Sequence, residues 1–144
     1  MNALVVYDSK FGNTEQLALA IAEALGAPAV RATDELPLLG VELLVVGAPT
    51  QQHNVAPPMR QVLDALSEHA LDGMAAVAFD TRFRRNPLLT GSAARGIARR
   101  LERRGARLVA GPESFFVAGT EGPLEDGELA RATDWARSLA AVPA

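Results

Sequence analysis

The sequence predicts an α/β fold in which a five-stranded parallel sheet carries helices on both faces. Short, nearly continuous apolar segments alternate five times with longer segments of helical apolar spacing, and strands buried on both faces have this apolar composition. Each step from strand to strand takes roughly 30 residues, the length of a unit in which a helix connects two parallel strands. Because 144 residues is the size of one domain, we expect a single domain over residues 1–144.

The first half of the chain supplies three of the five strands. Residues 3–7 are apolar with β-branched valines, and residues 13–25 carry apolar side chains at helical spacing until a glycine and a proline end the segment. Residues 29–32 form a weaker strand. Residues 42–46 form a strong one, since all but the first are Leu or Val, and we expect Gly47-Ala48-Pro49 to end it.

The second half repeats the pattern. Two prolines open a helix over residues 57–69, where proline suits the first turn because no backbone donor is needed. Residues 75–79 form the fourth strand, and a helix follows over residues 92–104, closed by Gly105. The remaining predicted elements are a fifth strand, split between residues 108–109 and 115–117, and a last helix over residues 125–141, in which we interpret Trp135 as a packing residue.

Charge is segregated along the chain. The net charge is −3, yet residues 81–110 carry nine arginines against one acid, while residues 1–80 carry ten acids against three basic residues. The arginines of the predicted helix over residues 92–104 fall mainly outside its apolar stripe, which favours a solvated face. The alternative is a docking patch or an electrostatic guide for an anionic ligand.

The composition excludes several classes of site. Cysteine is absent, which removes disulfides, thiolate nucleophiles and cysteine metal sites, and the two histidines, His53 and His69, are too few for a three-histidine zinc site. No apolar segment approaches the ~20 residues of a membrane span. The N-terminal segment lacks a basic leader and meets Asp8 early, unlike a signal peptide, so we expect a cytoplasmic protein without a membrane or nucleic-acid partner.

Ligands of parallel α/β sheets bind outside the carboxyl ends of the strands, which directs attention to the loops 8–14, 47–58 and 80–91. The first loop reads Asp8-Ser9-Lys10-Phe11-Gly12-Asn13-Thr14 and leads from a strand into a helix. Hydroxyls on both sides of a glycine, next to helix N-terminal amides, favour an anion site for a phosphate. The alternative is a simple helix cap formed by Asn13 or Thr14.

Competing phosphate motifs do not fit this loop. The dinucleotide fingerprint requires three glycines at fixed spacing and the loop has one, and the nucleotide P-loop requires a lysine that does not follow Gly12. A response-regulator receiver shares the alternation of strands and helices, but it needs an aspartate at the end of the third strand, where Gly47-Ala48-Pro49 stands.

Residues 5–21 resemble the flavodoxin signature. They read Val5-Val6-Tyr7-Asp8-Ser9-Lys10-Phe11-Gly12-Asn13-Thr14-Glu15-Gln16-Leu17-Ala18-Leu19-Ala20-Ile21, with the aromatic residue, the hydroxyls, the alanine and the aliphatic residue at the spacing of that family. The resemblance implies a short-chain, flavodoxin-like three-layer sandwich with strand order 2-1-3-4-5. It also implies non-covalently bound flavin mononucleotide (FMN), with its phosphate held by Ser9, Lys10, Phe11, Gly12, Asn13 and Thr14.

The resemblance implies that two further loops hold the isoalloxazine ring. After the third strand the expected contacts are Pro49, Thr50, Gln51, Gln52, His53 and Asn54. This loop has no Trp or Tyr, so His53 is the planar candidate for stacking, with an unengaged surface histidine as the alternative. No glycine follows His53, and Asn54 is the residue that would accept the positive φ of a peptide flip.

The loop after the fourth strand supplies the other expected contacts, which are Asp80, Thr81, Arg82 and Phe83. Phe83 covers the ring or packs as core, and Thr81 meets the pyrimidine carbonyls. Flavodoxins are acidic around the flavin, and the arginines of this loop depart from that pattern.

The resemblance implies a flavodoxin-type electron carrier that shuttles electrons between a reductase and an acceptor protein. The cluster Arg82, Arg84 and Arg85 is the expected contact for an acidic redox partner, and no catalytic residue or metal ligand is expected. The alternative is a small FMN-dependent NAD(P)H:quinone or azo-type oxidoreductase, and a domain without flavin is a third reading. Quinone and azo reductases of this type usually need insertions or a subunit interface to build a substrate pocket. This chain is short, which favours the carrier.

Overall fold

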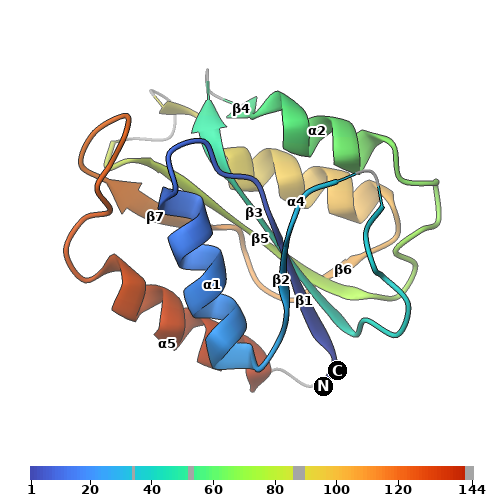
Figure 1. The fold of residues 1–144 in the computed structure, drawn as a ribbon. Helices are drawn as coiled ribbons and strands as arrows, with labels where there is room; N and C mark the ends of the chain where they lie inside the picture. The colour runs from blue at the N-terminus through green and yellow to red at the C-terminus, as the bar shows by residue number, and fades with distance from the viewer. Residues whose placement is uncertain (34, 52–53, 86–89, 142–144) are drawn as a thin grey trace.

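The computed structural model describes residues 1–33, 35–51, 54–85 and 90–141. A twisted, mostly parallel sheet lies between two layers of helices (Figure 1). Helices α1 (Asn13–Leu25) and α5 (Glu128–Ala140) cover one face, and α2 (Pro57–Asp64) and α4 (Ala93–Arg103) cover the other. The predicted α/β architecture is therefore confirmed. Within the described part of the chain, no helix combines the length and apolar composition needed to cross a membrane.

The strands follow the order β2-β1-β3-β5, and β5 pairs with two short strands along its outer edge. Their bounds are β1 (Ala3–Tyr7), β2 (Ala29–Arg31), β3 (Leu43–Gln51), β4 (Asn54–Val55), β5 (Ala75–Phe83), β6 (Arg107–Leu108) and β7 (Glu113–Val117). All pair in parallel except β4, which turns back antiparallel on the end of β3. Because β6 and β7 together form the split fifth strand, the expected order 2-1-3-4-5 is confirmed.

Two strands are longer than predicted. β3 continues to Gln51 and β5 to Phe83, so the strand ends expected at residues 47–49 and at residue 79 are wrong. Gly47 lies opposite Phe79 in the register, and a side chain at position 47 would collide with the Phe79 ring. The glycine makes room for that ring and does not end the strand. Pro49 is tolerated because β1 ends opposite Gly47, which leaves β3 with a single parallel neighbour there.

Helix ends differ from prediction where tertiary contacts determine them. α2 ends at Asp64 and not at residue 69, and Arg104 donates hydrogen bonds to the carbonyls of Asp64 and Leu66 at that point. α5 begins at Glu128 and not at residue 125, directly after Gly127, whose φ is 84°. α1 has the predicted bounds, and α4 is one residue shorter at each end.

Small and aliphatic side chains fill both layers between the sheet and the helices. The aromatic residues of the core lie on the α1 and α5 face, where Trp135 packs edge-to-face on Phe79 and Phe115 with ring centroids 6.1 and 5.7 Å away. The interpretation of Trp135 as a packing residue is therefore confirmed.

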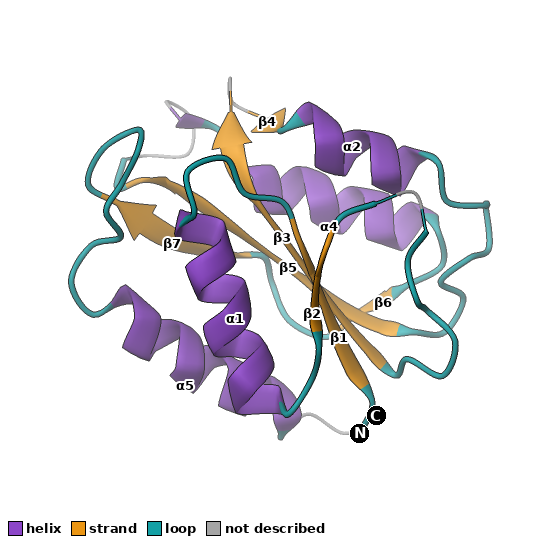
Figure 2. Cartoon of the chain, in the orientation of Figure 1, coloured by secondary structure: helices purple, strands orange, loops and turns teal. Residues whose placement is uncertain are grey.

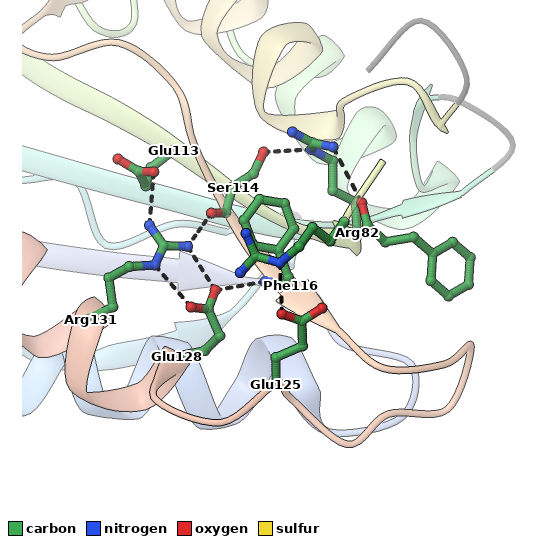
Figure 3. A network of polar contacts seen from close by, with 9 residues as sticks. Arg82, Glu113, Ser114, Phe116, Glu125, Glu128 and Arg131 are labelled. Atoms are coloured by element: carbon green, nitrogen blue, oxygen red, sulfur yellow. Dashed lines mark hydrogen bonds and ion pairs between the residues drawn. The ribbon is translucent and has the colours of Figure 1, made fainter. Parts of the chain in front are cut away.

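Side chains of α5 cover the outer edge of β7 (Figure 3). Glu128 accepts a hydrogen bond from the backbone N–H of Phe116 at 2.8 Å, and Arg131 donates to the backbone carbonyl of Ser114. Glu128 and Arg131 also form an ion pair with each other at 2.7 Å. Because these groups occupy backbone positions that another strand would need, the network protects the sheet edge from further pairing.

Candidate functional site

The carboxyl edge of the sheet holds a cavity of about 490 Å³. Its walls come from the loop after β1, the ends of β3, β5 and β7, and residues Arg85, Thr90 and Thr120. The strand ends meet at one edge of the sheet (Figure 2). The lining residues are Ser9, Lys10, Phe11, Asn13, Thr14, Pro49, Thr50, Gln51, Thr81, Arg82, Phe83, Arg85, Thr90, Val117 and Thr120. A volume of this size is within the range of small-molecule and cofactor sites.

The loop between β1 and α1 is held in shape by its own polar groups. The Asp8 carboxylate accepts from the amide of Ser9 at 2.9 Å, and the Ser9 hydroxyl oxygen accepts from the amides of Gly12 at 3.1 Å and Glu15 at 3.3 Å. Gly12 precedes the helix with φ of 91° and makes no side-chain cap, so neither Asn13 nor Thr14 caps α1. Asn13 and Thr14 as caps are therefore wrong, and the Ser9 hydroxyl accepts from amides at the start of the helix instead.

The same loop leaves donors for a ligand. Among the described residues, the backbone amides of Lys10, Phe11, Asn13 and Thr14 have no hydrogen-bond acceptor. All four residues belong to the loop or to the first turn at the positive end of the α1 dipole, and all four line the cavity. Unpaired amides at a helix N-terminus that open into a cavity form an anion site.

Thr14 and Thr81 connect this loop to the end of β5. Their hydroxyl oxygens are 3.1 Å apart, and the side chains are almost fully buried, with exposures of 1% and 5%. Two hydroxyl groups carry two protons, and their mutual hydrogen bond uses only one. The second proton is therefore available to a ligand in the cavity that both residues line.

Two aromatic side chains in the cavity wall remain partly exposed. Phe11 is 45% exposed and Phe83 is 39% exposed, although most large apolar residues of the chain are buried. Exposed rings in a cavity are surfaces on which a planar ligand can stack. The predicted contacts Gln52 and His53 lie outside the described residues.

Arg82 lies at the cavity but is held by other parts of the chain. Its Nε donates to the Ser114 hydroxyl at 2.9 Å, and its terminal nitrogen donates to the backbone carbonyls of Arg85 at 2.7 Å and Phe83 at 3.3 Å (Figure 3). The guanidinium also lies over the Phe116 ring at 5.1 Å. These contacts fix a positive charge beside the cavity.

The two other arginines of the expected docking cluster differ from each other. Arg84 forms an ion pair with Glu125 at 2.9 Å and lies over the Phe116 ring at 4.2 Å. Arg85 lines the cavity. Arg82 and Arg84 therefore already have intramolecular partners, which weakens the cluster as a surface for an acidic protein.

Asp80 is placed under α4 and not on the cavity wall. Its side chain is fully buried, and one carboxylate oxygen accepts from the Ser92 hydroxyl at 2.6 Å and from the amide of Ala94 at 2.9 Å. Thr50 accepts from the amide of Ala93 at 3.0 Å, so β3 and β5 both cap α4. The other Asp80 oxygen has no partner among the described residues, and burial raises the pKa of this carboxyl.

Two further predicted contacts do not line the cavity, and four residues that line it were missed as cofactor contacts. Gly12 serves as the turn before α1, and the Asn54 side chain accepts from the amide of Val55. The residues that prediction missed are Arg85, Thr90, Val117 and Thr120. Val117 and Thr120 follow the fifth strand, and its carboxyl end at the same sheet edge was the signal that could have found them.

Known proteins similar to this chain were found by comparing structures and not by comparing sequences. No family model matches the sequence, and no curated protein matches it significantly. Flavodoxin 2 from Bacillus cereus superposes with a TM-score of 0.82 at 22% identity, over 97% of this chain and 98% of that one. A flavodoxin from the domain Archaea superposes with a TM-score of 0.78 at 23% identity, over 97% of this chain and 96% of that one.

A longer protein contains the same architecture as a part. Rubredoxin oxygen:oxidoreductase from Desulfovibrio gigas superposes with a TM-score of 0.74 at 16% identity, and the match covers 96% of this chain but 35% of that chain. The sheet order, the helices on both faces and these superpositions agree with one another, and the expectation drawn from residues 5–21 is met at the level of architecture. The chain therefore has the flavodoxin-like fold.

Proposed function

We propose that the chain binds FMN in the cavity at the carboxyl edge of the sheet and acts as an electron carrier between a reductase and an acceptor protein. The observation that carries the proposal is the loop from Ser9 to Thr14, whose unpaired amides open into a cavity that also exposes two aromatic rings. A phosphate at one end and a planar ring at the other are the two parts of FMN that such a site would hold.

Each part of the site has a role in this proposal. The amides of Lys10, Phe11, Asn13 and Thr14 and the Thr14 hydroxyl hold the phosphate, whose charge the α1 dipole favours. Thr81, the end of β3 and the exposed Phe83 contact the ring. When bound, the flavin supplies reversible electron transfer, and the chain's own contribution is to bind and orient it and to fix Arg82 beside it.

The elements around the cavity favour a carrier over a reductase. Within the described residues no inserted domain stands over the cavity to build a second substrate pocket. The partners in this proposal are a reductase and an acceptor protein, and its compartment is the cytoplasm.

Calorimetric titration of the flavin-free protein with FMN and with riboflavin tests the cofactor. FMN should bind at least about tenfold more tightly than riboflavin. Each hydrogen bond that the site donates to the charged phosphate contributes about 1.5–3 kcal/mol, and riboflavin lacks the phosphate. Equal affinity for the two flavins would refute the phosphate site.

A kinetic assay on the FMN-loaded protein separates the carrier from the reductase. The carrier should exchange electrons with a chemically reduced or oxidised protein partner and show no sustained NAD(P)H oxidation in the presence of a quinone. Multiple turnovers of NAD(P)H with a quinone would establish the oxidoreductase alternative instead.

A further inference from the structure

The arginines of α4 and of the turn after it fall into two groups. Arg100 forms an ion pair with Asp64 at 3.1 Å, and Arg104 donates to backbone carbonyls at the end of α2, so both bind α4 to α2. Arg95, Arg99 and Arg103 are exposed, and within the described ranges no acid lies within ion-pair distance of them. The first group has a structural role that the second lacks.

Arg95, Arg99 and Arg103 form a single stripe, because residues four apart lie on one face of a helix. We call these three residues the α4 stripe. Eight residues at 1.5 Å of rise each give it a length of about 12 Å. The stripe lies on the outer side of α4, away from the sheet, since the inner side of the helix is formed by buried Ala94, Ile97, Ala98 and Leu101.

Helix stability explains only the C-terminal end of the stripe, because Arg103 lies in the last turn, where the helix dipole favours a cation. Like charges four residues apart repel one another, and Arg95 lies in the first turn, where the positive end of the helix dipole opposes a cation. The first turn of α4 contains no acid, and Glu102 does not pair with any of the three arginines among the described residues. The stripe therefore carries unfavourable electrostatics that a negatively charged partner would relieve.

The stripe begins beside the cavity. Arg95 and Arg82 line a second, smaller depression together with Ser92, Glu113 and Ser114, and Arg82 also lines the main cavity. The first amide of α4 donates to Thr50, another residue of the main cavity wall. A protein bound along the stripe would thus lie next to the opening of the candidate cofactor site.

We propose that the α4 stripe is the docking surface for an acidic protein, which places it next to the cavity for electron exchange. The redox part of this statement rests on the proposed function, whereas the docking itself does not require the flavin. An acidic patch on a folded protein matches the charge and the short length of the stripe.

Two other polyanions fit the surface less well. A nucleic acid would extend past the stripe onto a molecule whose net charge is −3 and whose first 80 residues carry ten acids against three basic residues. A membrane-binding helix needs large apolar residues beside its basic ones. On the described part of the chain none of the exposed large apolar residues belongs to α4; they are Met1, Phe11, Leu19, Leu39, Phe83 and Leu129.

The test is an NMR titration of the isotope-labelled protein, with and without FMN, using a plant-type ferredoxin as the acidic protein probe at low ionic strength. Amide shifts should concentrate on residues 92–104 and should disappear at high salt. Cytochrome c, a basic protein, should not shift them. Shifts centred elsewhere would overturn the proposal. If FMN fails to bind but the shifts persist, the docking surface stands and only the proposed function fails.

Two variants with the same change of charge test whether ferredoxin binds at the α4 stripe. Arg99→Glu should weaken ferredoxin binding by about fivefold, whereas Arg137→Glu, an equal charge change on an exposed arginine of α5 that pairs with Asp134, should change it less than about twofold. Equal weakening by both variants would show that net charge alone acts and would overturn the proposal. Tighter binding of duplex DNA or of anionic vesicles at the same ionic strength, abolished by Arg99→Glu, would overturn the choice of a protein partner.

Discussion

At position 47 the close approach of two strands leaves no room for a side chain. A Cβ atom there would overlap the Phe79 ring, which is fully buried and packs on Phe115 and Trp135. Gly47→Ala should therefore lower the free energy of unfolding by about 1–3 kcal/mol, the usual effect of overpacking a core. Urea unfolding measures this change.

Gly111→Ala is the matched control for that variant. Gly111 has no atom within 4 Å of its hypothetical Cβ and no positive φ, so the free energy of unfolding should stay within about 0.5 kcal/mol of the parent. If Gly47→Ala unfolds at the same urea concentration as Gly111→Ala, then Phe79 has an alternative rotamer and the tight contact is not a constraint.

Thr14 tests the phosphate assignment at the level of one hydroxyl. Thr14→Val keeps the shape of the side chain but removes its hydrogen bond to Thr81 and its donor to a ligand. FMN binding should weaken by about 1–3 kcal/mol, the loss of a hydrogen bond to a charged group, while riboflavin binding should change much less. Lys10→Ala should weaken FMN binding less than Thr14→Val, because the backbone amides and the helix dipole carry most of the neutralisation. Equal losses for FMN and riboflavin in a fluorescence titration would contradict the assignment.

At the scale of elements, Glu128 and Arg131 of α5 pair with each other and join the helix to the edge of β7, where Glu128 accepts from the Phe116 amide and Arg131 donates to the Ser114 carbonyl. The hydrogen bond from Arg131, the largest influence, holds the pKa of Glu128 below its usual range, and the Phe116 amide acts in the same direction. A carboxyl whose pKa is lowered by folding stabilises the protein above its unfolded pKa, ordinarily about 4.3. That contribution is lost as the pH falls through the lower, folded-state pKa.

Glu128→Gln should accordingly lower the free energy of unfolding by about 1–3 kcal/mol at pH 7, because Arg131 loses a charged partner. The difference from the parent should stay constant above about pH 5 and should shrink as the pH falls through the lowered pKa of Glu128. Urea unfolding at a series of pH values measures it. Glu68→Gln, at an exposed position, is the control and should show a small difference. A Glu128→Gln difference that grows toward low pH would contradict this role.

The elements also show what the sequence could and could not predict. Apolar periodicity located the central strands and helices, because strand and helix spacing are local properties of the chain. The ends of β3 and β5 depend on contacts between strands and could not be predicted from local sequence. Gly47, for example, is required by the Phe79 ring on the neighbouring strand. The end of α2 depends on Arg104, which lies 40 residues from the carbonyl of Asp64 that it binds.

The candidate site likewise has parts that could be predicted from the sequence and parts that could not. The anion loop could be predicted because its amides, its glycine and its hydroxyls are contiguous in residues 8–14. Asp80 was expected at the flavin because it follows a predicted strand, and only the packing of α4 on β5 reveals that it caps that helix. Val117 and Thr120 carry no motif of their own, so their place in the cavity wall follows only from the folded sheet.

At the scale of the whole molecule, the cavity is assembled from four chain segments that are distant in the sequence. Loop 8–14, the end of β3, the end of β5 with Arg85 and Thr90, and Val117 with Thr120 form its walls, while the buried centres of β1, β3 and β5 lie below it. A ligand that fills this cavity would contact all four segments at once. Binding to the folded state alone stabilises it by about 2.7 kcal/mol when the ligand is present at 100 times its Kd.

Hydrogen exchange measured by mass spectrometry can separate the parts of the ligand. FMN should slow amide exchange in loop 8–14, at residues 81–85 and at residues 117–120 together, because amides near a bound ligand open less often. Riboflavin lacks the phosphate, so it should protect the second and third segments and leave loop 8–14 close to its ligand-free rate, since the unpaired amides of Lys10, Phe11, Asn13 and Thr14 would still lack an acceptor. Protection by FMN of loop 8–14 alone would place the ring outside the cavity, and identical protection by both flavins would remove the phosphate from the loop. The three segments respond together only if the carboxyl edge of the sheet is one site.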